Sequence, residues 1–306
     1  MVVFYYLSLR AKLEVMTWLT FAILTALLGS LASLYEKRVL RTLHSIDFSA
    51  AIAFVAALIT SPVLFTASWE HISPNILLMC FGLSFVSAMA FLSVTRGIRH
   101  MEISLSSPLF LLGPLITTVL AFVILGELVT KIQMLGMLVI LLGTYVLETT
   151  RTLYPREFFK NIWGNIYSRH ILLGLFLYGF SSVGDRFILK QMGVSPVLYT
   201  AIIQFFIAIQ FLFLTWYYRG SPVASMNFVK ENWVGILVLA LLTVGYRITQ
   251  GYAVSLAVAV GLVIAIKRSS SLFTTIIGGE LFHDQGILRK SLACVVMIGG
   301  VYLIAL

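Results

Sequence analysis

Long apolar runs alternate with short polar connections along almost the whole chain. An α-helix needs about 20 mainly apolar residues to cross a bilayer, and a helix satisfies its own backbone hydrogen bonds inside lipid. Ten runs have the character of such spans. They cover residues 18–40, 48–67, 76–94, 105–125, 134–147, 171–189, 196–217, 233–254, 260–277 and 288–306. The pattern predicts an all-α integral membrane protein with ten transmembrane helices.

Composition agrees with this interpretation and excludes several classes of protein. The 306 residues are 60% hydrophobic and 11% charged, whereas soluble domains carry about 25% charged residues. The net charge of +9 comes mainly from the connections, where membrane topology and anionic headgroups explain it, so no nucleic-acid partner is expected. Cys80 and Cys294 lie within apolar runs, and the histidines lack metal-ligand spacing. We expect no disulfide, metal or cofactor.

The two halves of the chain repeat one another. The tripeptide GEL at 126–128 recurs at 279–281, an offset of 280 − 127 = 153 residues. Residues 33–40 (SLYEKRVL) resemble residues 182–189 (SVGDRFIL), each with an acidic residue followed by a basic one. A polar connection near residue 150 separates the two copies. Five spans per copy is an odd number, so the copies must enter the membrane from opposite sides. Such inverted repeats build a binding site near the bilayer midplane in many secondary transporters.

The predicted organisation has four parts. Residues 1–17 are an N-terminal extension, 18–149 the first five-helix repeat, 150–169 a linker and 170–306 the second five-helix repeat.

Several motifs together resemble one known family. They are the start MTWLTFAILTALLGS at 16–30, the endings LGEL and GGEL of the two fourth spans, and the duplication itself. The chain from residue 16 onward resembles the EamA family of the drug/metabolite transporter superfamily. This resemblance implies a ten-helix carrier of two inverted EamA-type repeats, with a central cavity lined by the first four helices of each repeat.

Two adjacent cations interrupt the ninth span. Lys267 and Arg268 stand in the string IAIKRSSSLF, where the first repeat has Pro114 and Leu115 at the offset of 153 residues. Cationic side chains near the middle of a bilayer carry a large free-energy cost, so they are usually associated with a function. Arg247 in the eighth span precedes the turn between the two spans by about ten residues, and Lys267 follows it by about ten. At a rise of 1.5 Å per residue, both lie about 15 Å from that turn.

Three cations at one depth repel one another unless an anion joins them. Arginine offers a planar fork suited to phosphate or carboxylate, and lysine adds a compact charge. Hydroxyl groups of Ser270 and Ser271, one helical turn further on, can donate to the same anion. Tyr246 and Gln250 can bind a neutral part of the substrate. These seven residues form the predicted substrate site.

The adjacent Lys267 and Arg268 also resemble the Lys-Arg pair on the ninth helix of the plastidic sugar-phosphate translocators, a branch of the same superfamily. That resemblance implies that the pair binds substrate phosphate. The alternative is that these cations only form ion pairs with acidic residues, above all Asp185 in the sixth span or Glu36 in the first. Both acids are also candidates for coupling or gating, because carboxylates inside transporters often relay protons.

The leading expectation is a secondary transporter that moves a small anionic, phosphorylated metabolite by alternating access. A flippase for a lipid-linked phosphate and an exporter of amino acids or other metabolites are the alternatives. The sequence contains no catalytic triad arrangement, P-loop or glycine-rich cofactor fingerprint, so an enzyme is not expected. The expected partners are a small molecule or lipid phosphate and the bilayer, in a cell (inner) membrane. Monomer and homodimer remain open. The resemblance implies cytoplasmic termini, whereas the distribution of Lys and Arg favours the opposite orientation.

Overall fold

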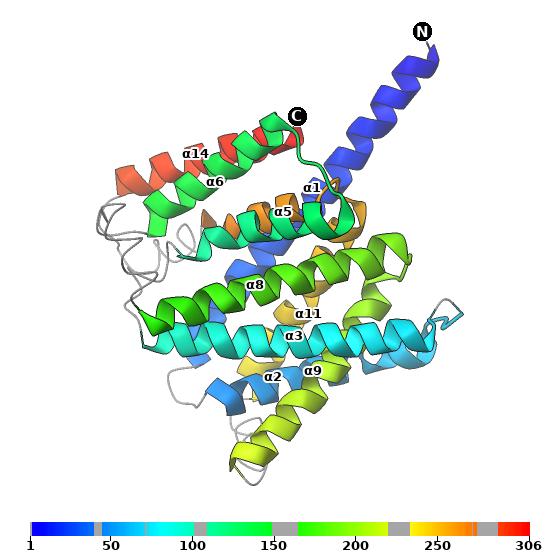
Figure 1. The fold of residues 1–306 in the computed structure, drawn as a ribbon, viewed down its shortest axis with the longest axis vertical. Coiled ribbons are helices and arrows are strands. Elements are labelled where there is room, and N and C mark those ends of the chain that lie inside the picture. The colour runs from blue at the N-terminus through cyan, green and yellow to red at the C-terminus, as the bar shows by residue number, and fades with distance from the viewer. Residues whose placement is uncertain are drawn as a thin grey trace.

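The computed structural model describes residues 2–39, 45–70, 72–100, 109–148, 165–219, 233–270, 272–273 and 287–306. Every element in these ranges is a helix, which confirms the predicted all-α class. The helices are α1 (Val2–Val39), α2 (Ser45–Thr66), α3 (Pro74–Arg99), α5 (Leu112–Leu125), α6 (Lys131–Glu148), α8 (Ile166–Arg186), the π-helix η2 (Phe187–Gln191), α9 (Pro196–Arg219), α11 (Trp233–Leu256), α12 (Val260–Arg268) and α14 (Ile287–Ala305) (Figure 1).

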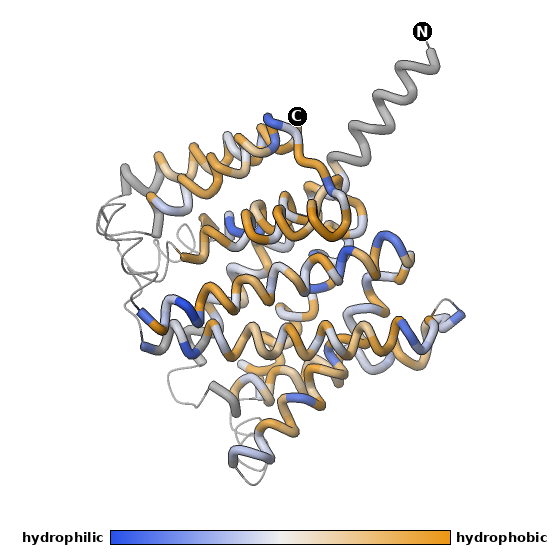
Figure 2. Tube along the Cα trace, viewed as in Figure 1, coloured by the Kyte–Doolittle hydropathy of each residue, from blue (hydrophilic) through white to orange (hydrophobic). Residues whose placement is uncertain are grey.

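Within the described ranges, six helices are long and apolar enough to cross a membrane. They are α1, α2, α3, α8 with η2, α9 and α11, and three shorter apolar helices lie in α5, α6 and α14. Apolar residues follow the helices along their length, while hydrophilic residues gather mainly near helix ends (Figure 2). Helix α1 begins at Val2, so the predicted N-terminal extension continues into the first span. The predicted ninth span, 260–277, extends beyond the described part of α12, and the count of ten spans stays a prediction.

The main packing contacts join helices from the two halves of the chain. Helix α3 packs against α8, α1 against α11, α2 against α9 and α6 against α14. Helices α3, α8 and α5 lie side by side across Figure 1, and α6 and α14 form a pair at one edge. The arrangement is reciprocal, because α1 opens the first half and packs on α11, while α8 opens the second half and packs on α3. Among the described helices, the interior is therefore built mainly by contacts between the halves.

Glycines let these helices approach closely. A Cβ added at Gly136 would lie 2.7 Å from the carbonyl oxygen of Gly300, and one at Gly300 would lie 2.8 Å from that of Gly136, across the contact of α6 with α14. Between α3 and α8, a Cβ added at Gly174 would lie 2.9 Å from the Ala90 carbonyl oxygen. Small residues at such interfaces are typical of helix packing in lipid, where close van der Waals contact replaces the hydrophobic drive.

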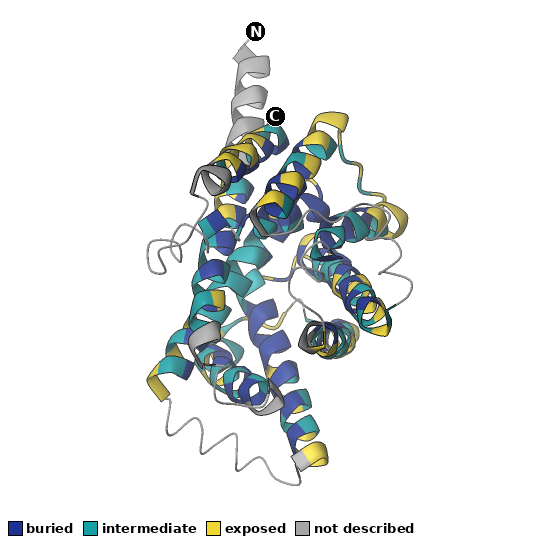
Figure 3. Ribbon diagram, turned by 90° about the vertical axis from the view of Figure 1, so that its left-hand side faces the viewer, coloured by how far each residue is buried: buried dark blue, intermediate teal, exposed yellow. Residues whose placement is uncertain are grey.

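Buried positions face neighbouring helices, and the exposed ones face outward (Figure 3). The core is rich in small residues, with Trp18 as its largest fully buried side chain at 1% exposure. Large apolar side chains on the outer faces, such as Val123 at 71% exposure, suit a surface that contacts lipid.

We expect Gly174→Ala to destabilise the protein, whereas Gly82→Ala does not. The added methyl group at 174 would meet backbone atoms of α3, and overpacking of this kind costs about 1–3 kcal/mol. Gly82 lies on the exposed face of α3, and a Cβ added there would meet nothing within 4 Å. Thermal unfolding in detergent measures the difference. Equal midpoints for the two variants would contradict the close α3–α8 contact.

Candidate functional site

A cavity of about 510 Å³ lies between the two halves of the chain. Its lining residues come from α1, α2, α3 and α5 in the first half and from α8, α9, α11 and α12 in the second, with Ser270 after α12. None of the lining residues belongs to α6 or α14. The described lining residues therefore come from both halves of the chain.

Three cations share this cavity with one carboxylate. Arg247 from α11 and Lys267 and Arg268 from α12 line it, and Asp185 from α8 is the acidic residue among its described lining residues. These four side chains carry a formal charge of +2, from three cations and one carboxylate. The structure thus brings Arg247 and Lys267 to the same cavity, because α11 and α12 run in opposite directions from the turn between them.

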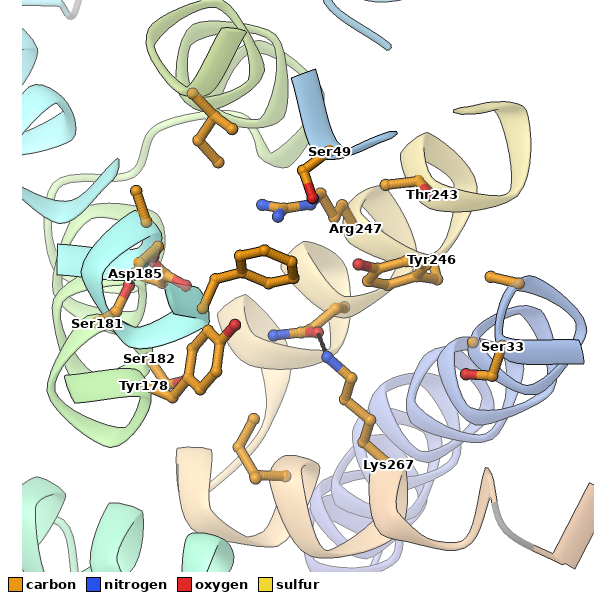
Figure 4. A pocket seen from close by; sticks show the side chains of 18 of the residues that line it. Ser33, Ser49, Tyr178, Ser181, Ser182, Asp185, Thr243, Tyr246, Arg247 and Lys267 are labelled. Atoms are coloured by element: carbon orange, nitrogen blue, oxygen red, sulfur yellow. Dashed lines mark hydrogen bonds between the residues drawn. The ribbon is translucent and has the colours of Figure 1, made fainter. Parts of the chain in front are cut away.

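Lys267 is held by two of the residues that were expected to contact a neutral part of the substrate. Its Nζ donates a hydrogen bond of 2.7 Å to Oε1 of Gln250 and lies 5.1 Å from the centre of the Tyr246 ring. Figure 4 shows Lys267 reaching from α12 toward Tyr246 and Arg247 on α11. Gln250 and Tyr246 therefore hold the ammonium group from α11.

Arg268 points toward the first half of the chain. Its guanidinium lies 5.4 Å from the centre of the Phe110 ring, and a Cβ added at Gly113 would lie 3.3 Å from its Nη2. Glycine at 113 leaves room for this side chain beside α5. Lys267 and Arg268 therefore face different parts of the cavity, as expected of neighbours on a helix.

Arg247 has a buried donor without a partner. Its Nε has no hydrogen-bond partner among the described residues, and its guanidinium reaches toward the side of the cavity where Ser49 lies (Figure 4). Buried polar atoms are almost always paired with protein, water or a ligand.

Asp185 accepts a hydrogen bond from the buried hydroxyl of Tyr199 on α9. Arg247 and Lys267 stabilise its negative charge across the cavity. The carboxylate is therefore placed between one neutral donor and two cations, which is compatible with both the coupling and the ion-pair interpretations. Glu36 lies in α1, but its side chain is outside the described residues, and so is Ser271.

The cavity also contains polar residues that the sequence interpretation did not single out. They include Ser33, Ser49, Ser87, Thr117, Tyr178, Ser181, Ser182, Gln204 and Thr243. A signal for two of them was present, because Ser33 and Ser182 open the matching strings SLYEKRVL and SVGDRFIL. Phe211 is only 6% exposed and also lines the cavity. No group of three or more His, Cys, Asp or Glu in the described ranges could hold a metal ion.

Comparison with known proteins finds a family match in the first half of the chain. Residues 16–149 match the model of the EamA-like transporter family. This match supports a place in the drug/metabolite transporter superfamily, and with the six apolar helices it makes the chain a multi-pass integral membrane protein. A solved structure titled "Crystal structure of protein" shares the fold, with a TM-score of 0.63, 15% identity and coverage of 96% of both chains. No curated protein matches the sequence.

We expect Tyr199→Phe to lower the thermal stability of the purified protein. The substitution leaves the Asp185 carboxylate without its buried donor, which costs about 1–3 kcal/mol. Tyr217→Phe is the matched control, because Tyr217 is 70% exposed on the same helix. The melting midpoint of each variant in the same detergent gives the comparison. Identical midpoints would show that the Tyr199 hydroxyl contributes nothing to the fold.

Proposed function

We propose that this protein is a secondary transporter that carries a small anionic, phosphorylated metabolite across the membrane by alternating access. The observation that carries the proposal is the cavity between the two halves, where Arg247, Lys267 and Arg268 outnumber Asp185 three to one. Charges in a membrane interior are costly unless a partner neutralises them. A bound anion supplies that partner.

The architecture of the proposal is a ten-helix carrier made of two inverted five-helix repeats. Its support is the reciprocal packing, in which α1 contacts α11 as α8 contacts α3, while α2 contacts α9 and α6 contacts α14. These are the contacts expected when two similar units are related by a two-fold axis. The cavity draws on corresponding helices of both halves, as in transporters whose site lies at a repeat interface.

The chemistry of the cavity favours phosphate over other anions. Two guanidinium groups can each present a pair of donors to phosphate oxygens, and the ammonium of Lys267 adds a third charge. Hydroxyl groups such as those of Ser33, Ser182 and Ser270 line the remaining wall and can bind hydroxyl groups of a sugar or another polar body. A volume of about 510 Å³ lies within the range of about 300–1,000 Å³ that is usual for small-molecule sites.

The net positive charge disfavours a cationic substrate, and with it the export of amines. The proposal also takes the protein to be a carrier and not an enzyme, since the sequence offers no catalytic arrangement of the known kinds. The resemblance of Lys267 and Arg268 to the pair of the sugar-phosphate translocators supports the phosphorylated class without naming one member of it.

We expect phosphorylated metabolites to raise the melting temperature of the purified wild-type protein, because a ligand that binds the folded state stabilises it by mass action. Lys267→Ala and Arg268→Ala should each weaken binding by about ten- to a hundredfold, the range for loss of a charge-assisted hydrogen bond. Lys131→Ala is the control, because Lys131 is an exposed cation at the start of α6 and lies outside the cavity.

The same screen separates the alternatives. Stabilisation by long-chain lipid phosphates alone would favour a flippase, and stabilisation by amino acids or amines alone would favour an exporter. Equal stabilisation of the wild type and both cavity variants by phosphorylated metabolites would rule out the anion site.

The role proposed for Asp185 is to couple transport to protons. Charged or titratable groups face it from four elements: Cys80 from α3, Tyr199 from α9, Arg247 from α11 and Lys267 from α12. An incoming anion competes with the carboxylate for the two cations. Protonation of Asp185 removes that competition, so substrate and proton would bind together.

We expect Asp185→Asn to abolish the response of transport to a proton gradient while substrate binding persists. The amide is always neutral, so it cannot exchange a proton between the two sides. Flux in proteoliposomes with and without an imposed pH gradient measures the effect, and Glu70→Gln, at an exposed carboxylate, is the control. A gradient that drives the Asp185→Asn variant as strongly as the wild type would exclude this role.

A further inference from the structure

One polar cluster lies outside the cavity and joins the two halves of the chain. Glu127, in the GEL string that follows α5, forms an ion pair of 2.5 Å with Nε of Arg186 at the end of α8. Its other oxygen accepts a hydrogen bond of 2.8 Å from the backbone N–H of Val260, the first residue of α12. A carboxylate at a helix N-terminus satisfies an otherwise unpaired donor and complements the helix dipole. Gly126, with φ +68°, makes the turn that places Glu127 there.

Arg186 holds the turn between α11 and α12 from the other side. It is 1% exposed and donates to the backbone carbonyl oxygens of Val254, Ala257 at 2.6 Å and Val258 at 3.0 Å. Lys190 on η2 adds a bond of 3.1 Å to the Ala257 carbonyl. Each of the three guanidinium nitrogens therefore has an acceptor. We call Glu127, Arg186 and the backbone of residues 254–260 the gate cluster.

The gate cluster lies at one end of the helix bundle, and the cavity is displaced toward the other. In α2 the lining residues are 48, 49, 52 and 53, close to the start of the helix at Ser45. In α9 they are 204, 207 and 211, in the part that leads to Arg219, and in α11 they stop at Gln250, before the helix ends at Leu256. None of the residues of the gate cluster lines the cavity.

Asp185 and Arg186 mark the boundary between the two. Asp185 points into the cavity, whereas Arg186, the next residue, is buried in the gate cluster. Lys267 lies seven residues beyond Val260 on α12, about 10 Å along the helix axis. The gate cluster therefore lies between the cations and this end of the helix bundle. There it links the end of α5 to α8, α11 and α12.

We infer that the gate cluster is the closed gate at one end of the transport pathway. The inference rests on the proposed transporter function, since it assigns the control of access to the same cavity. The first and second halves cannot part at this end while Glu127 spans them. Opening requires the ion pair and the cap on α12 to be exchanged for water. Because α12 carries Lys267 and Arg268 at its other end, movement of its N-terminus also moves the cations of the site.

Cysteine accessibility tests the gate without any substrate. Cys80 and Cys294 are first replaced by alanine, and Ser182→Cys places a reporter in the cavity, one turn above Asp185. Ser68→Cys, in the connection between α2 and α3, marks the gate side. His100→Cys marks the opposite side, because α3 and α8 are antiparallel with Gly97 beside Tyr167 and Gly184 beside Leu83. A membrane-impermeant maleimide is applied to each side of sealed vesicles in turn.

With Glu127 intact, the maleimide should label the cysteine introduced at position 182 when it is applied from the side of residue 100. When it is applied from the side of residue 68, the labelling rate should be at least about tenfold lower. Glu127→Gln should raise the slow rate by about tenfold, the factor for losing one charge-assisted interaction. The isosteric amide can satisfy Arg186 or Val260 but presents its NH₂ group to the other donor. Glu127→Asp, which keeps the charge on a shorter side chain, should give an intermediate rate.

Glu70→Gln is the matched control, because it removes an exposed carboxylate in the same α2–α3 connection and should leave both rates unchanged. Gel filtration confirms that each variant is folded. Equal reactivity from both sides in the native background would overturn the gate, and so would folded Glu127→Gln and Glu127→Asp variants whose gate-side rates match the background. Failure of the binding screen alongside a positive labelling result would instead overturn the phosphate substrate and leave the gate in place.

Discussion

Burial of the Arg186 guanidinium imposes the strictest requirement on this fold. A charged group with 1% exposure must find a counter-charge and acceptors inside the protein, because removal of one partner of a buried pair costs several kcal/mol. Glu127 and three backbone carbonyl groups meet that requirement. Since these partners come from the end of α5 and from the α11–α12 turn, the positions of three helices depend on one side chain of α8.

The geometry of the cavity depends on these contacts of Arg186. Helix α12 is only nine residues long, so the support at its first residue sets the depth and rotation of the whole element. Lys267 and Arg268 stand in its last turn, where Gln250 and Tyr246 hold the first cation and Phe110 faces the second. The cations are thus placed by contacts at both ends of a short helix, whereas the longer helices contribute walls that mix hydroxyl-bearing, small and large apolar residues.

The sequence was sufficient for the all-helical membrane class and for most of the cavity's charged residues. Residue spacing along one hairpin placed Arg247 near Lys267, because both lie on helices of known rise that share a turn. The sequence could not show that Gln250 is hydrogen-bonded to Lys267, because that contact depends on side-chain rotamers. The sequence also could not pair Arg186 with Glu127, which is 59 residues away. Pairing over such a separation follows from how the halves dock, and no local pattern encodes it.

The ratio of three cations to one carboxylate has an electrical consequence. With the proposed phosphate bound, at a charge of about −1.5 to −2, and with Asp185 protonated as proposed, the cavity carries about +1 to +1.5, whereas the empty cavity is positive by two formal charges. Each elementary charge that crosses a membrane potential of 100 mV exchanges about 2.3 kcal/mol with the field. The voltage of the membrane would therefore act more strongly on the return of the unloaded protein than on the passage of the loaded one.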